Sequence, residues 1–288
     1  LYFYMCGLLN KKIKHIYHRI DYSTGKSLFG NTSGFKNNFS GQLQKAGKTY
    51  KTEEANSLRN NGFLQLGKIY DDEYLNKIKK KYDNMIENDE YSYSRISYEG
   101  NVYNRQLLND PCPIPEFSKL LTDQIKNIMS DYFGGHFQIK RIQGSRNYHI
   151  PSDILTKREF YSDHWHCDNR DTDSYWKIFI LLSDVTDDDG PLHLVTRSRT
   201  KELMKMGFHT RDDYDLSDDV LYDPKYLVKH TGPIGTVVIG NPTLCLHRAG
   251  IPSLGHTRDM IYLMLGRSDE PIRNDWIDHQ DFNDHQYD

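Results

Sequence analysis

The feature that most constrains the fold is a series of strand-like segments that begins near residue 136 and ends near residue 266. "HFQIKRIQ" alternates polar and apolar residues, and "YWKIFILLSDV" (175–185) is rich in β-branched and aromatic residues and ends at the acidic turn "TDDDGP". Three more segments follow between turns rich in Gly and Pro, namely "LHLVTRS", "GTVVIGN" and "RDMIYLMLGRS". Short strands at this spacing predict a β sandwich or barrel.

Upstream of these strands the periodicity is helical. Apolar residues recur every three to four positions, and Thr52 and Gly62 are typical first and last residues of a helix. The pattern predicts helices over 52–62, 71–88 and 114–133. Helices followed by strands indicate an α+β protein. We expect one domain over 52–267, with a helical opening (52–133) and a β core (136–266), an irregular leader (1–51) and an acidic tail (268–288).

Composition excludes several classes of protein. The net charge is −3, so the chain lacks the basic footprint of a nucleic-acid-binding protein. The cysteines are scattered without a CxxC pair, which argues against a disulfide framework or a structural zinc site and favours a reducing compartment: Cys6, Cys112, Cys167 and Cys245. The apolar start "LYFYMCGLL" is too short to span a bilayer, which needs about 20 residues. We expect a cytoplasmic protein without membrane association, and the oligomeric state is left open.

The stretch "HWHCD" (164–168) places His164, His166 and Asp168 on one face of an extended strand. The chain has 13 His, so this spacing alone does not distinguish a metal site from a histidine-rich polar strand. Downstream, His247 follows a strand, and Arg258 begins the last one. Two imidazoles and one carboxylate form the facial triad that holds Fe(II) and leaves other coordination positions open.

These motifs are similar to those of a known family. "HWHCD", "KIFILLSDVTDDDGPLHLV" and "LHRAG…TRDMIYLML", with eleven residues from His247 to Arg258, resemble the phytanoyl-CoA dioxygenase family of iron- and 2-oxoglutarate-dependent oxygenases. "LRNNGFLQLGKIYDDEYLNKIKKKY" resembles the family's opening. The resemblance covers residues 52–266. It implies a double-stranded β-helix (a cupin-like jelly roll) with N-terminal helices buttressing one sheet.

The resemblance also implies site residues. It assigns Fe(II) to His166, Asp168 and His247, and the distal carboxylate of the cosubstrate 2-oxoglutarate to Arg258, whose rigid guanidinium suits a carboxylate. Gln138 lies where relatives carry a polar residue that touches the cosubstrate. O₂ is the other cosubstrate. A carboxylate at position 168 favours hydroxylation over halogenation.

The chain departs from the family at two places. Many relatives have Ser two residues after the distal histidine, where this chain has Ala249, so other groups are expected to help hold 2-oxoglutarate. The usual "PGSH" after the Gly-Pro-Leu strand is replaced by "TRSRT" (196–200).

Further residues are candidates for the surroundings of the metal or the substrate pocket: His164, Tyr161, His193 and Arg197. For His193, a structural role is the alternative, and for Arg197, a solvated one. Trp165 and Cys167 should face away from the metal and pack in the core.

Together these features predict a 2-oxoglutarate-dependent non-haem iron dioxygenase. It would hydroxylate, or otherwise oxidise, an unactivated C–H bond of a small molecule and release succinate and CO₂. The alternative is a catalytically inactive metal- or ligand-binding jelly roll. A demethylase is a third possibility, although the absence of a basic groove argues against a nucleic-acid substrate. The identity of the substrate is left open.

Overall fold

A computed structural model describes residues 51–96, 100–108, 112–155, 160–168, 175–206, 223–268 and 270–277. The predicted leader therefore lies outside the described residues except for Lys51, as does the end of the predicted tail from residue 278 onward. None of the described helices combines the length and the apolar run that a bilayer crossing requires.

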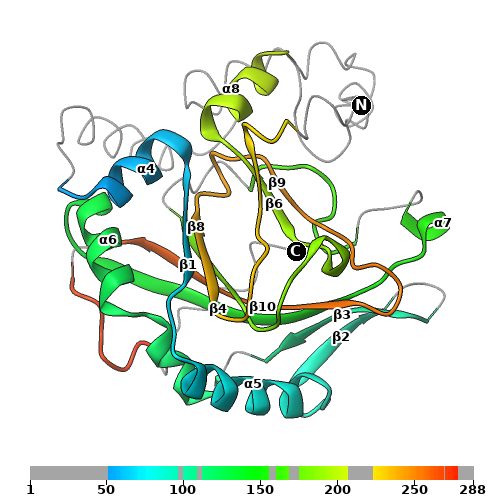
Figure 1. The fold of residues 1–288 in the computed structure, drawn as a ribbon. Helices are drawn as coiled ribbons and strands as arrows, with labels where there is room; N and C mark the ends of the chain where they lie inside the picture. Colours follow the sequence, from blue (N-terminus) through cyan, green and yellow to red (C-terminus); the bar gives the residue numbers. More distant parts are fainter. Residues whose placement is uncertain are drawn as a thin grey trace, which may run out of the picture.

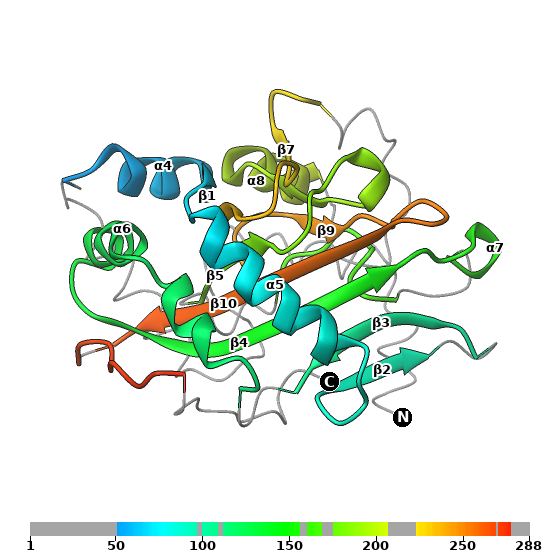
Figure 2. The ribbon, with the colours of Figure 1, turned by 60° about the horizontal axis from the view of Figure 1, so that its bottom comes forward.

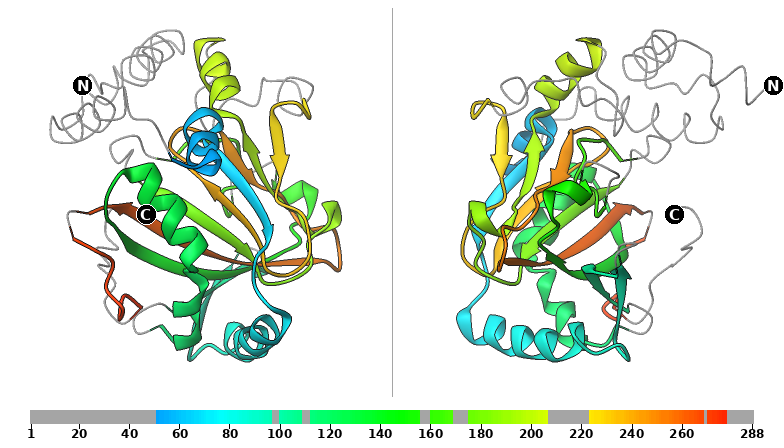
Figure 3. Two further views of the ribbon diagram at one scale, coloured as in Figure 1. Left: turned by 60° about the vertical axis from the view of Figure 1, so that its left-hand side comes forward. Right: turned by 90° about the vertical axis from the view of Figure 1, so that its right-hand side faces the viewer.

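Two antiparallel sheets face each other (Figures 1 and 3). The major sheet has the strand order β1-β8-β5-β10-β4-β3-β2, and the minor sheet has the order β7-β6-β9. The major strands are β1 (Phe63–Lys68), β2 (Ser92–Ile96), β3 (Val102–Leu107), β4 (Phe137–Tyr148), β5 (Trp176–Leu181), β8 (Thr236–Gly240) and β10 (Thr257–Arg267). The minor strands are β6 (Leu192–Val195), β7 (Leu227–Lys229) and β9 (His247–Ala249).

Helices cover the outer faces of this pair of sheets. In Figure 2, α5 lies across β4 and β10, while α8 lies on the opposite side of the molecule. The helical elements are α4 (Glu53–Asn61), α5 (Asp72–Ile86), the 3₁₀ helix η1 (Pro115–Leu120), α6 (Asp123–Phe133), α7 (Ser152–Leu155), the 3₁₀ helix η3 (Asp187–Asp189) and α8 (Arg197–Met206). Because α5, η1 and α6 take one face of the major sheet, its other face is left for the minor sheet.

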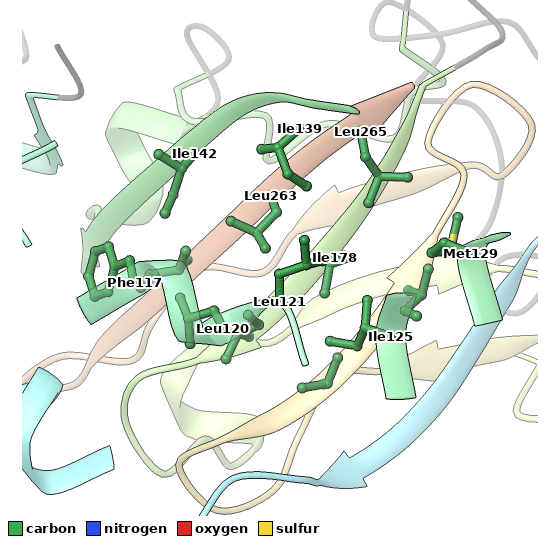
Figure 4. Packing of buried hydrophobic residues seen from close by; sticks show 14 of the residues in the cluster. Phe117, Leu120, Leu121, Ile125, Met129, Ile139, Ile142, Ile178, Leu263 and Leu265 are labelled. Atoms are coloured by element: carbon green, nitrogen blue, oxygen red, sulfur yellow. The ribbon is translucent and has the colours of Figure 1, made fainter. Parts of the chain in front are cut away.

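The main hydrophobic core lies between the helices and the outer face of the major sheet (Figure 4). Apolar residues of α6 and η1 such as Ile125 and Leu120 pack toward Ile178, Leu263 and Ile142 on the strands. A smaller apolar cluster fills part of the space between the two sheets: Phe63, Phe179, Leu192, Leu194, Val238, Cys245 and Met260. Alternation along each strand thus divides side chains between an outer face and an interior face.

The structure differs from the expected elements in three places. The helix expected over 114–133 is broken, because Thr122 caps a new helix by accepting a hydrogen bond from the backbone N–H of Ile125. The opening expected to be helical also contributes β1, β2 and β3 to the major sheet. The strand expected over "LHLVTRS" ends at Val195, because the Thr196 hydroxyl accepts from the N–H of Arg199 and begins α8.

The segment expected to be an acidic tail is partly core. Trp276 and Ile277 are only 5% and 6% exposed and belong to the main cluster beside the major sheet. Two large apolar residues outweigh the acidic composition around them, since burying each one contributes roughly 1.5–3 kcal/mol.

Candidate metal centre

The backbone brings the first and the last predicted ligands together. His166 and His247 form an isolated antiparallel bridge. The backbone nitrogen of His166 lies 3.0 Å from the carbonyl oxygen of His247, and the nitrogen of His247 lies 2.9 Å from the oxygen of His166. Two residues further on, the N–H of Asp168 donates to the carbonyl of Pro242 at 2.9 Å. The segment that carries the HxD motif is therefore held against the distal histidine, which begins β9, and against Pro242, which follows β8.

The three predicted metal ligands converge. Their ligand atoms lie within 4.8 Å of one another. Asp168 Oδ1 is 3.5 Å from Nε2 of both His166 and His247. Ligands of one divalent ion at about 2.1 Å lie roughly 3 Å apart, so a small contraction would place all three on a single metal ion. The donor set, two imidazoles and one carboxylate, suits Fe(II).

Hydrogen bonds orient both imidazoles for a metal. His166 Nδ1 lies 2.8 Å from the carbonyl oxygen of His164, and His247 Nδ1 lies 3.1 Å from that of Cys245. A carbonyl oxygen only accepts, so Nδ1 carries the proton in each neutral ring. The lone pair is then on Nε2, the atom that faces Asp168.

Lys177 on β5 holds the other oxygen of the carboxylate. Its Nζ lies 2.7 Å from Asp168 Oδ2 and 5.2 Å from the centre of the Tyr262 ring. Burial would raise the pKa of Asp168, but the Lys177 ammonium helps to hold that pKa well below its usual range. Burial likewise would lower the pKa of Lys177, and Asp168 raises it. Both groups are therefore charged at neutral pH.

Arg258 is a buried cation without a carboxylate partner among the described residues. The residue is only 2% exposed, and NH1 of its guanidinium donates to the carbonyls of Gly190 and Gly250. Its Nε is buried and has no hydrogen-bond partner. Burial lowers the pKa of Arg258 to about 10. Such a group is suited to an anion that enters from outside the chain.

The two carbonyls that accept from Arg258 belong to Gly190 and Gly250, whose backbone segments pack closely against each other. A Cβ added to Gly190, whose φ is +65°, would lie 2.4 Å from the backbone nitrogen of Pro252. A Cβ added to Gly250 would lie 2.5 Å from the carbonyl oxygen of Pro191. A side chain at either position would separate these segments and disturb the guanidinium.

Tyr161 lies close to this arginine. Its hydroxyl donates to the carbonyl of Tyr148 at 2.9 Å, and the Arg258 charge partly counters the burial that raises the Tyr161 pKa. The ring belongs to an apolar cluster with Ile150, Phe160 and Ala249. Ala249 thus presents its methyl group to this apolar cluster.

Gln138 is not brought to the metal or to Arg258. It pairs with Gly266 at the far end of β10, whereas Arg258 pairs with Asn147. Positions 138 and 147 are nine residues apart along β4, a span of about 30 Å. The Gln138 amide donates instead to the carbonyls of Glu270 and Pro271, at 3.2 Å and 2.7 Å.

The other candidates also lie outside the ligand set. His164 Nε2 is 3.8 Å from Asp163 Oδ2. His193 lies on the outer face of the minor sheet, because it alternates with the interior residues Leu192 and Leu194 and its ring is 6.1 Å from Trp165.

Arg197 likewise serves the packing of helices. It is the first residue of α8, and its NH1 donates to the carbonyl of Arg59 in α4 at 3.1 Å. Trp165 packs with Val195 and Leu203 on the outer side of the minor sheet.

Sequence reasoning did not single out Lys177, although a signal was present. It is the only charged residue of the strand "WKIFIL", whose other members are all apolar. A lone lysine in a buried strand implies a buried anion beside it. His230, which is 1% exposed, was also missed.

Comparisons with known proteins relate the chain to others through its structure. No family model matches the sequence, and no curated protein matches it. Solved structures do match. EctD from S. alaskensis with 2-oxoglutarate and 5-hydroxyectoine has a TM-score of 0.56 at 15% identity, over 76% of this chain and 77% of that one.

Two further structures extend the comparison. The epimerase SnoN in complex with Fe³⁺, alpha ketoglutarate and nogalamycin RO has a TM-score of 0.53 at 13% identity, over 80% of this chain and 89% of SnoN. HygX from Streptomyces hygroscopicus, with nickel, 2-oxoglutarate and hygromycin B bound, has a TM-score of 0.52 at 15% identity, over 77% and 89% of the two chains. The chain has the jelly-roll fold of these proteins. The α+β fold class is thereby confirmed, and the narrower resemblance to the phytanoyl-CoA dioxygenase family stays a prediction.

Proposed function

We propose that this protein is an Fe(II)- and 2-oxoglutarate-dependent dioxygenase that oxidises an unactivated C–H bond of a small molecule. One observation carries the proposal. The interior between the sheets holds a metal-type triad (His166, Asp168, His247) together with Arg258, a buried cation that has no carboxylate partner among the described residues. The triad matches Fe(II), and the arginine matches the far carboxylate of 2-oxoglutarate.

The protein's own groups would act by holding and orienting. The two imidazoles offer Nε2 lone pairs because their Nδ1 protons are held by backbone carbonyls. Arg258 would fix the distal end of the cosubstrate, and the carbonyls of Gly190 and Gly250 fix Arg258 in turn. Iron with 2-oxoglutarate and O₂ supplies the oxidation, with succinate and CO₂ as co-products.

The side chains on the interior face of β4 indicate the chemical class of the substrate. By alternation with Gly144 and Arg146, which face α5, the side chains of Gln143 and Asn147 face the minor sheet. Asn147 accepts a hydrogen bond from Asn104 at 2.6 Å, and both are almost fully buried. A polar interior wall of this kind supports a polar small molecule as substrate over a hydrocarbon chain.

The proposal is tested by succinate release from 2-oxoglutarate in the presence of Fe(II), ascorbate and O₂. The assay is run without an added substrate and with a panel of polar small molecules. Asp168→Ala should abolish succinate release, and Arg258→Met should show release only at much higher 2-oxoglutarate concentrations. Arg273→Met is the matched control, because that arginine is exposed and pairs with Asp275 on the surface.

Succinate release that requires Asp168 and Arg258 and is accelerated by a panel member supports the oxygenase. Tight binding of Fe(II) and 2-oxoglutarate with no succinate under any condition contradicts it and favours a metal-binding protein without turnover.

A further inference from the structure

Lys177 stands out on the interior face of the major sheet. Its neighbours Trp176 and Ile178 pack in the outer core, and Phe179 packs between the sheets, so Lys177 points into the interior. The residue opposite it on β8 is Gly240, which has no side chain. The lysine therefore meets no facing side chain on β8, and its ammonium reaches Asp168 of the metal triad.

Because Lys177 contacts Asp168, the two carboxylate oxygens of Asp168 have different partners. Oδ2 accepts from Lys177 at 2.7 Å, and Oδ1 faces both imidazole Nε2 atoms at 3.5 Å. The pair is largely enclosed, with side-chain exposures of 18% for Lys177 and 28% for Asp168. Each oxygen thus has its own partner.

An ammonium group beside the triad lowers its affinity for a divalent cation, because like charges repel more strongly in an enclosed site. A neutral donor would hold the carboxylate without this repulsion. The lysine is better explained by an effect on how the carboxylate coordinates.

We infer that Lys177 is a positioning residue of the metal centre, which restricts Asp168 to coordination through one oxygen. The inference rests on the proposed function. In a six-coordinate centre, two imidazoles and one carboxylate oxygen leave three positions open. A carboxylate that binds through both oxygens leaves two. Lys177 thereby keeps one more position for an exogenous ligand beyond the two that a chelating 2-oxo acid occupies.

The test counts the water ligands of bound Mn(II), which accepts the same nitrogen and oxygen donors. The full chain is loaded with Mn(II) alone in ¹⁷O-enriched water, and the coordinated waters are counted by electron–nuclear double resonance. We expect three waters in the wild type and two in Lys177→Met, where the freed Oδ2 takes a position. Mn(II) should also bind several-fold more tightly to that variant, because a neighbouring cation is gone.

Two further variants separate positioning from packing. Lys177→Arg retains a cationic donor to Oδ2 and should restore three waters. Lys229→Met is the matched control. It removes a lysine that also lies 2.7 Å from an aspartate oxygen, that of Asp187, but on the exposed surface, and it should keep three waters. If Lys177→Met does not fold, Lys177→Leu replaces it, since leucine is also apolar and cannot donate to Oδ2, and two waters are expected.

Three waters in a folded Lys177→Met or Lys177→Leu would overturn the inference, as would two waters in Lys177→Arg. A wild-type protein that binds no Mn(II) at micromolar concentration would instead contradict the proposed function, because the triad itself would then fail.

Discussion

Arg146 on β4 donates to both carboxylate oxygens of Asp259 on β10, at 2.7 Å from Nε and 2.7 Å from NH2. The two residues are directly opposite each other in the β4–β10 pairing. Because Asp259 is held on the outer face by this pair, the preceding residue, Arg258, is directed to the interior. Arg146 thus pairs with a carboxylate of the chain, whereas Arg258 has no carboxylate partner among the described residues.

This pair should be important for stability. Asp259 has a side chain only 3% exposed, and loss of Arg146 would leave its charge with two long contacts, to Lys79 Nζ at 3.3 Å and to the Tyr82 hydroxyl at 3.4 Å. Breaking a buried ion pair costs about 3 kcal/mol or more. We expect Arg146→Met to lower the free energy of unfolding in urea by about 3 kcal/mol.

The matched control is Arg273→Met, whose pair with Asp275 is exposed and should change stability by less than about 0.5 kcal/mol. Adding Asp259→Asn to Arg146→Met should recover part of the loss, since the unpaired charge is removed. A loss below about 1 kcal/mol in Arg146→Met would show that the pair is not a stabilising contact.

Arg258→Met should separate binding from stability. The guanidinium is buried without a carboxylate among the described residues, so its removal relieves an uncompensated charge while it deprives two carbonyls of a donor. These effects oppose each other, and we expect stability within about 1 kcal/mol of the wild type. Affinity for 2-oxoglutarate, measured calorimetrically with Mn(II) present, should fall by about 100-fold or more. Unchanged affinity would remove Arg258 from the cosubstrate site.

Ala249→Ser introduces the hydroxyl that the resemblance to the phytanoyl-CoA dioxygenase family leads one to expect at this position. Residue 249 shares the interior face with His247, and the next residue, Gly250, accepts from Arg258. A new hydrogen bond to the cosubstrate carboxylate is worth about 1 kcal/mol, so 2-oxoglutarate should bind about five-fold more tightly. The same calorimetric titration measures this change. Equal or weaker binding would mean that the methyl group lies out of reach of the cosubstrate.

Part of this fold and site follows from local sequence, and part depends on contacts that sequence does not display. The proximity of His166, Asp168 and His247 could be expected from their motifs beside strands, and the roles of these residues and of Arg258 stay predictions. Gln138 was placed by its strand position alone, but β4 is twelve residues long, and Gln138 lies at the end opposite to Arg258.

Other differences arise from packing and capping. The core contribution of Trp276 was hidden by the acidic residues around it. The start of α8 depends on one threonine hydroxyl. Lys177 was visible as a lone charge in an apolar strand, but only the structure reveals that its partner is a metal-type ligand.

The buried His230 should make stability depend on pH. Burial lowers its pKa from 6.5 to about 4, and its Nε2 lies 3.1 Å from the carbonyl of Thr236. Between about pH 4 and pH 6.5 the unfolded chain holds a proton at this residue and the folded chain does not. Stability from this group is therefore complete above about pH 6.5 and falls by about 1.4 kcal/mol per pH unit as the pH drops toward 4.

His230→Gln should reduce the slope of unfolding free energy against pH by about 1.4 kcal/mol per pH unit, which corresponds to one proton. The Gln amide can still donate to Thr236 but does not titrate. Urea unfolding at a series of pH values between about 4.5 and 7 gives the slope for each protein. Identical slopes in the variant and the wild type would show that His230 does not contribute.

The most direct test of the central claim is the absorption spectrum of the protein with Fe(II) and 2-oxoglutarate under anaerobic conditions. Chelation of Fe(II) by the 2-oxo acid gives a weak visible charge-transfer band. We predict this band in the wild type, its absence in Asp168→Ala, and its recovery in Arg258→Met only at much higher 2-oxoglutarate concentrations. A wild-type protein that binds Fe(II) through His166 and His247 yet shows no band at saturating 2-oxoglutarate would contradict the account.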